Sequence, residues 1–155
     1  MNPYAPPEAA VRDAPAKAGS ALKAVALGLV VDVGGTVLSG LIFGIVYAMV
    51  LGASGSSAEE IAARVTHVDT DSWLFYAASS LGLGFSLLGG YVCARVARRS
   101  EYRLGGILAV LSAALGALMA GEQYQLGTLL SITLAGIGAT LFGTRLGYLK
   151  NRGAK

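Results

Sequence analysis

The stretch AVALGLVVDVGGTVLSGLIFGIVYAMVL, from Ala24 to Leu51, decides the fold class of this chain. Asp32 carries its only formal charge, and the surrounding residues are mostly apolar or small. About 20 consecutive apolar residues suffice for a helix to cross the hydrocarbon core of a bilayer. The stretch therefore predicts a membrane-spanning helix that carries an acid.

Three further apolar runs follow, so the chain is predicted to cross the membrane several times. Of its 155 residues, 54% are hydrophobic and only 14% are charged, which is more apolar than a soluble domain requires. We predict an all-α, four-helix transmembrane domain over residues 21–150. Its helices are expected at about 22–51, 72–97, 103–120 and 126–149. Short connections near Ser100 and Gln123 favour an up-down bundle.

The segments outside the apolar runs differ in composition. Residues 1–20 hold all 4 prolines among alanines and mixed charges, a composition that predicts a disordered cytoplasmic tail. In the external loop 52–71, Ser57 and Glu60 have the spacing of a capping box, which predicts a short helix over 58–66 on the membrane surface. Asp71 or Ser72 is expected to cap the second long helix. Residues 151–155 form the other cytoplasmic end.

The distribution of basic residues predicts the orientation. All but one of the 12 Lys and Arg residues lie near the N-terminus, in the connection after the second apolar run, or near the C-terminus. Cytoplasmic loops retain Lys and Arg, so we expect both termini in the cytoplasm and the protein in the cell (inner) membrane. The basic rim favours anionic lipid headgroups as partners. Membrane topology accounts for the basic charge, and no nucleic-acid partner is expected.

Glycine gives the second strong signal, because most of the 22 glycines fall inside the predicted helices. Small residues recur there at steps of four, so that each helix carries a row of them. In a membrane such rows let helix backbones approach closely. The glycines that we expect at these contacts are Gly40, Gly44, Gly82, Gly90, Gly143 and Gly147.

Asp32 has two interpretations, which differ in its depth. Counting back from the outer helix end near Gly52 at 1.5 Å per residue places it about 30 Å inward, at the cytoplasmic edge. Arg95 and Arg145 reach about the same level, so the first interpretation is a charge collar of Asp32, Arg95 and Arg145. In the alternative, Asp32 lies about two turns deep as a proton or cation site.

Motifs for catalysis and for cofactor binding are missing from the sequence. No nucleophile has a recognisable base, and no glycine-rich phosphate loop joins a strand to a helix. The single Cys93 and the lone His67 do not make a metal site. We therefore expect no catalytic residues, no cofactor, no metal and no enzymatic activity.

Two functions are compatible with these features. The first is a structural or accessory membrane component that packs, through its glycine rows, against a second copy or a larger membrane complex. The alternative is an oligomeric transporter of a small molecule or ion that uses Asp32.

The segment GGYVCARVARR, from Gly89 to Arg99, is followed by a short turn and by Gly105-Gly106. In this it resembles small uncharacterised bacterial four-helix membrane proteins, which have a GGYVxAR-type exit from the second helix. The resemblance implies the same architecture and no particular activity.

Overall fold

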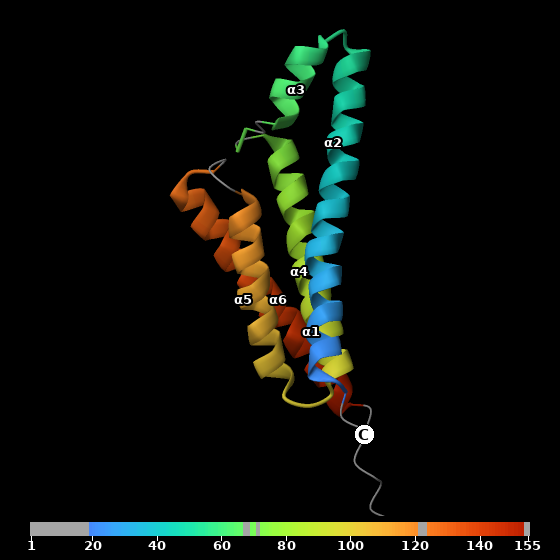
Figure 1. Ribbon diagram of the computed structural model, residues 1–155, viewed down its shortest axis with the longest axis vertical. Helices are drawn as coiled ribbons and strands as arrows, with labels where there is room; N and C mark the ends of the chain where they lie inside the picture. The colour runs from blue at the N-terminus through green and yellow to red at the C-terminus, as the bar shows by residue number, and fades with distance from the viewer. Residues whose placement is uncertain (1–18, 67–68, 71, 121–123, 154–155) are drawn as a thin grey trace, which may run out of the picture.

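The computed structural model describes residues 19–66, 69–70, 72–120 and 124–153, and this part of the chain is helical without strands (Figure 1). The expected disordered tail lies outside the described residues, except for Gly19 and Ser20. The elements are α1 (Ala21–Leu29), a π-helical turn η1 (Val30–Gly34), α2 (Gly35–Ala53), α3 (Ala58–Thr66), α4 (Trp73–Ala97), α5 (Glu101–Ala120) and α6 (Leu126–Arg152).

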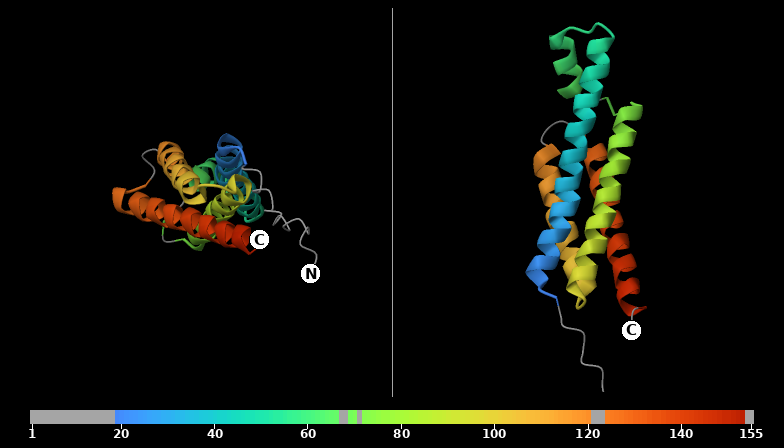
Figure 2. Two further views of the ribbon diagram at one scale, coloured as in Figure 1. Left: turned by 90° about the horizontal axis from the view of Figure 1, so that it is seen from below. Right: turned by 90° about the vertical axis from the view of Figure 1, so that its right-hand side faces the viewer.

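Four helices are long and apolar enough to cross a membrane. The first comprises α1, η1 and α2 as one continuous span of 33 residues, and the others are α4, α5 and α6. Successive spans run in opposite directions in both side views (Figures 1 and 2). The described chain thus has the composition and architecture of a multi-pass membrane protein.

Serine side chains cap the helices where the sequence offers them. Ser57 and Glu60 form both hydrogen bonds of the capping box, Ser57 N–H to Glu60 Oε2 at 3.1 Å and Glu60 N–H to Ser57 Oγ at 3.3 Å. Ser72 caps α4 by accepting from Phe75 N–H at 3.2 Å. Asp71, the other expected cap, lies outside the described residues. Ser20 caps α1 by accepting from Lys23 N–H at 3.5 Å.

α3 packs along α2. A β-carbon added to Gly52 would lie 3.8 Å from the Ile61 side chain, and one added to Gly44 would lie 4.0 Å from Val65. The apolar face of α3 thus covers glycines of α2. In Figures 1 and 2, α3 and the outer part of α2 project beyond the outer ends of α4, α5 and α6.

The closest helix pair is α4 and α6, which run in the same direction. A β-carbon at Gly143 would collide with the Leu87 carbonyl oxygen, and one at Gly90 would collide with that of Thr140. Further toward the inner end, a β-carbon at Gly147 would lie 2.7 Å from the Tyr91 carbonyl oxygen. The small residues let the two backbones touch, as the sequence predicted for these glycines.

The other glycines expected at close contacts have looser surroundings. A β-carbon at Gly82 would lie 3.6 Å from Thr36, which is ordinary contact between α4 and α2, whereas one at Gly40 would meet nothing within 4 Å. The space beside Gly40 is open because α2 diverges from α5 and α6. Among the described residues α2 touches α3, α4 and η1, and it has no contact with α5 or α6.

The best-buried apolar side chains lie toward the end of the bundle that holds the start of α1. Ala24, Cys93, Ala97 and Leu108 form the core cluster there and are at most 1% exposed. At the same end the Gly19 N–H donates to the Ala97 carbonyl oxygen at 3.2 Å. The bundle is therefore tightly packed at the end that holds the start of α1 and open at the other end.

Candidate functional site: an acid at the floor of a cavity

Asp32 lies in the π-helical turn η1, and only 3% of its surface is exposed. Its Oδ1 accepts a hydrogen bond from Ser86 Oγ of α4 at 2.8 Å. Its Oδ2 is buried and has no hydrogen-bond partner among the described residues. A buried polar atom left without a partner costs about 1–3 kcal/mol, and more for a charged group. Most buried polar atoms in native folds are hydrogen-bonded, and the exceptions are often associated with a functional role.

The π-helical turn holds Asp32 against α4. A β-carbon at Gly89 would lie 2.7 Å from the Gly28 carbonyl oxygen and 2.8 Å from Asp32 Cβ, so only glycine allows this approach. One turn earlier on α4, the Phe85 ring occupies the space beside Gly35. Thr36 Oγ1 donates to the Asp32 carbonyl oxygen at 2.7 Å, which competes with the backbone hydrogen bonds of the turn. Single π-helical turns of this kind are frequent at functional sites.

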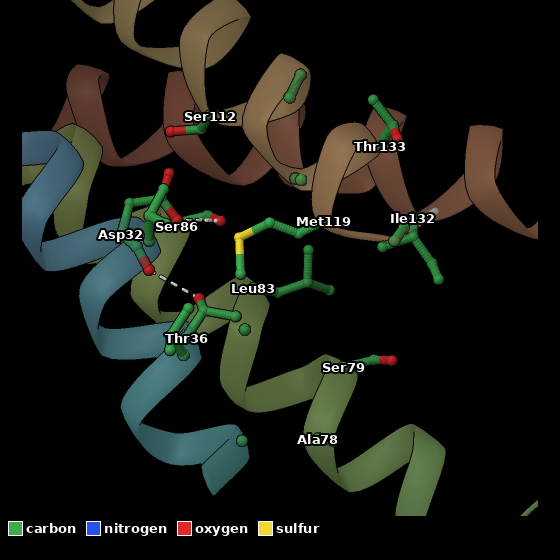
Figure 3. Close-up of a pocket in the computed structure, with 18 of the residues that line it drawn as sticks. Asp32, Thr36, Ala78, Ser79, Leu83, Ser86, Ser112, Met119, Ile132 and Thr133 are labelled. Carbon is green, nitrogen blue, oxygen red and sulfur yellow. Dashed lines mark hydrogen bonds between the residues drawn. The ribbon is translucent and has the colours of Figure 1, made fainter. Parts of the chain in front are cut away.

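Asp32 and Ser86 line a cavity of about 480 Å³ whose other lining residues come mostly from α2, α4, α5 and α6 (Figure 3). Small-molecule pockets in proteins commonly have volumes of about 300–1,000 Å³. The walls are mainly apolar, and Asp32 is the only charged residue among the described residues that line them. The polar lining residues are Asp32, Thr36, Tyr47, Ser79, Ser86, Ser112, Tyr124, Thr133 and Thr140.

Ser112 of α5 is the second polar group of the cavity with a free atom. Its Oγ is buried and has no hydrogen-bond partner among the described residues. Other helical hydroxyls in the chain donate to the carbonyl four residues earlier, as Ser131 does to Gly127 at 2.9 Å and Thr140 does to Gly136 at 3.0 Å. Ser112 therefore lines the cavity with a hydroxyl that makes no hydrogen bond within the described residues.

Aromatic side chains line the outer part of the cavity. Phe75, at the start of α4, and Tyr124, just before α6, pack with their ring centroids 5.9 Å apart. Both line the cavity together with Phe43 and Tyr47 of α2. The cavity thus extends from an acid on its floor to an aromatic outer end.

The neighbouring helices place Asp32 near the middle of the bundle. A β-carbon at Gly28 would lie 2.7 Å from the Leu108 side chain, and Asp32 is one turn beyond Gly28 in a helix that runs in the same direction as α5. Asp32 therefore lies near the level of Ser112, about 16 Å from the start of α5 at Glu101. α5 has 20 residues and is about 30 Å long, which matches the hydrocarbon core.

The depth expected from the sequence was counted from Gly52, which is the penultimate residue of α2. That end of α2 projects beyond the other helices (Figure 1). Counting along one helix gives a length, whereas the position of the apolar layer depends on the register of all four spans.

The structure does not bring together the three residues expected to form a charge collar. Asp32 pairs with Ser86, and no ion pair joins it to Arg95 or Arg145 in the described part of the chain. Arg95 lies six residues beyond Gly89 toward the inner end of α4, or about 9 Å, and donates from Nη1 to Asn151 Oδ1 at 2.9 Å. Arg145 is exposed on α6.

Sequence reasoning missed the roles of three side chains. Ser86, Ser112 and Asn151 were not among the residues expected at a site or a close contact. Asn151 accepts from Arg95 and donates from Nδ2 to the Ala94 carbonyl oxygen at 2.9 Å and to Glu101 Oε1 at 3.3 Å. It thereby ties α4, α5 and α6 together at the inner end. Ser86 lies in a row of small residues at steps of four on α4, with Gly82 and Gly90. Such a row predicts contact with a neighbouring helix, so it could have indicated that Ser86 faces one.

Of the two residues that sequence reasoning set aside as metal ligands, the structure describes only Cys93. Cys93 is fully buried in the core cluster. His67 lies outside the described residues. Within the described ranges no group of three or more His, Cys, Asp or Glu side chains is placed to hold a metal ion.

Comparisons of the chain with protein-family models, with curated proteins and with solved structures give no match.

Proposed function

We propose that the chain is a membrane transport protein that binds a small solute or ion in the cavity above Asp32. The observation that carries the proposal is an acid, only 3% exposed, that lines a cavity of about 480 Å³ between four apolar spans and whose buried Oδ2 has no partner among the described residues. Ionisable residues within membrane spans characteristically mark ion and substrate pathways.

The arrangement of the spans supports this proposal over a purely structural role. Gly90, Gly143 and Gly147, at the contact of α4 with α6, are used within the chain, so these three are not available to a partner. The divergence of α2 from α5 and α6 leaves the space that a solute requires. One chain therefore provides a cavity, and an oligomer is not needed to form it.

The orientation that we propose has both termini in the cytoplasm and the protein in the cell membrane. The structure supports it by gathering the start of α1 and the end of α4 at one end of the bundle, where Gly19 bonds to Ala97. The basic connection after α4 and the basic end of α6 lie at the same end. Reporter fusions at the C-terminus and in the α2–α3 connection test the proposal. It predicts a cytoplasmic signal from the first and an external signal from the second.

Transport is tested with purified protein in liposomes on a solid-supported membrane. Concentration jumps of 2-phenylethylammonium, sodium, 3-phenylpropionate and sorbitol, each with and without a proton gradient, should give a saturable current for at least one solute. Empty liposomes provide the background. The absence of any current above that background contradicts the proposal.

A matched pair of variants links the current to the cavity. Gly136 and Gly138 both lie on α6, and a β-carbon at either would meet nothing within 4 Å. Only Gly136 lines the cavity. Gly136→Leu fills part of the cavity and should reduce the current about tenfold or more, because the solute loses its binding volume. Gly138→Leu should leave the current near the wild-type value. Equal currents in the two variants would mean that the solute does not use this cavity.

The second candidate is the accessory component that the sequence favoured. One observation supports it: α2 is flanked by few helices, and large apolar side chains such as Leu41, Ile45 and Met49 are 56–68% exposed. Lipid or a partner helix can cover them. A partner that co-purifies in stoichiometric amounts, together with the absence of currents, would favour this candidate.

A further inference from the structure

The cavity has the electrostatics of a cation site. Asp32 is the only charged residue among its described lining residues, and no base lies beside it to neutralise a carboxylate. A ligand that is buried beside one uncompensated acid must itself carry a positive charge to compensate it. An anion at the same place would add like-charge repulsion to the cost of leaving water.

The oxygen atoms at the floor are too few for a bare metal ion. A hard cation such as Ca²⁺ takes about six to eight oxygen ligands, and Mg²⁺ takes about six. The floor offers only the two oxygens of the Asp32 carboxylate and the hydroxyl oxygens of Ser86 and Ser112. One bare ion would also leave most of the cavity of about 480 Å³ unfilled.

The two free atoms suit a ligand that donates hydrogen bonds. Asp32 Oδ2 can accept a hydrogen bond, and the Ser112 hydroxyl has lone pairs to accept a second one. An ammonium group with at least two N–H bonds can satisfy both. Charge-assisted hydrogen bonds of this kind are about twice as strong as neutral ones.

The walls suit the rest of such a molecule. Apolar side chains, including Val37, Leu83 and Ile137, line the middle of the cavity, and the aromatic residues Phe75 and Tyr124 line its outer end. An apolar or aromatic arm would gain from burial against them. A cation that passes the aromatic rings on its way to Asp32 is also attracted by their faces.

We propose that the ligand is a small organic monocation, an amine in its ammonium form with one apolar arm, whose N–H groups bind Asp32 Oδ2 and Ser112 Oγ. This inference rests on the proposed function, because it takes the same cavity as the ligand site. It adds the chemical class of the substrate.

The test is equilibrium binding of labelled 2-phenylethylammonium to the full chain in lipid nanodiscs. Unlabelled 2-phenylethylammonium should displace it saturably, whereas 2-phenylethanol and 3-phenylpropionate, of similar size, should displace it at least about tenfold more weakly. The trimethylated ammonium should also be weaker, because it has no N–H. Equal displacement by the alcohol, or the absence of saturable binding, overturns the inference.

Variants identify the atoms that bind the probe. Asp32→Asn can keep the hydrogen bond from Ser86 and should lower the affinity about tenfold or more, since it removes the charge. Ser112→Ala should lower it about two- to tenfold, and this variant breaks no hydrogen bond among the described residues. It therefore provides an independent test if Asp32→Asn fails to fold. The control is Ser80→Ala on α4, whose hydroxyl bonds to the Tyr76 carbonyl and does not line the cavity. Wild-type affinity in both site variants contradicts the inference.

The failure of the inference and the failure of the proposed function give different results. If 3-phenylpropionate or sorbitol drives a current that Gly136→Leu abolishes, the transport proposal stands and the ammonium class is wrong. If 2-phenylethylammonium binds through Asp32 but no solute drives a current, the ligand class stands and the transport proposal is wrong.

Discussion

Ser86 Oγ donates a 2.8 Å hydrogen bond to Asp32 Oδ1, across the interface between α4 and η1, and the second carboxylate oxygen of this cavity-lining acid stays buried without a partner among the described residues. The serine thereby fixes the orientation of the acid and does not neutralise it. A fixed, uncompensated acid inside apolar helices is the feature from which the functional proposals follow.

The first prediction concerns this hydrogen bond. A double-mutant cycle of Ser86→Ala and Asp32→Ala should give a coupling energy of about 0.5–2 kcal/mol, the range found for hydrogen bonds between membrane helices. The measurement is the free energy of unfolding in mixed micelles. Ser80→Ala, cycled with Asp32→Ala, is the control and should give no coupling, because Ser80 bonds only to its own helix. A coupling near zero for Ser86 would refute the prediction.

The second prediction concerns the contact between α4 and α6. Gly143→Ala should destabilise the protein by about 1–3 kcal/mol, because its β-carbon would collide with the Leu87 carbonyl oxygen and push the two backbones apart. Gly138→Ala on the same helix has open space around it and should have little effect or be slightly stabilising. Thermal unfolding in detergent measures both. Equal midpoints for the two variants would contradict the packing described for these helices.

The third prediction concerns Asn151 at the inner end of the bundle. Asn151→Ala removes hydrogen bonds to Arg95, Ala94 and Glu101, and should lower the free energy of unfolding by about 1–3 kcal/mol. Asn151→Asp should also destabilise, because it loses the donors to Ala94 and Glu101 and places a second acid beside Glu101. The exposed neighbour Lys150, replaced by Ala, serves as the control and should change the stability by less than about 0.5 kcal/mol. Wild-type stability of Asn151→Ala would disprove this role.

The fourth prediction concerns access to the cavity. Ser79 lines the cavity, whereas its neighbour Ser80 does not. In a Cys93→Ala background, Ser79→Cys should react with a charged, membrane-impermeant thiol reagent at least about tenfold faster than Ser80→Cys. The physical reason is that the reactive thiolate needs a hydrated environment and is disfavoured against lipid. Labelling followed by mass spectrometry gives the two rates, and similar slow rates would mean that the cavity is closed to water.

The sequence by itself determined the spans and the helix caps. Long apolar runs can satisfy their backbone only as helices in a bilayer, so four spans followed from composition and length. The capping box of Ser57 and Glu60 followed from local spacing, because its hydrogen bonds join residues three apart. The close contacts of Gly90, Gly143 and Gly147 followed from four-step rows of small residues, since each row lies along one face of a helix.

Only the tertiary structure decided where Asp32 lies and what surrounds it. Its depth depends on how far each span is shifted relative to the others, and its hydrogen bond to Ser86 joins residues 54 positions apart. The cavity exists because α2 diverges from α5 and α6, and no local pattern encodes the separation of two helices. Neighbouring residues fix a helix and its caps, whereas the register between helices is set by side-chain packing across the whole bundle, which decided the surroundings of the acid.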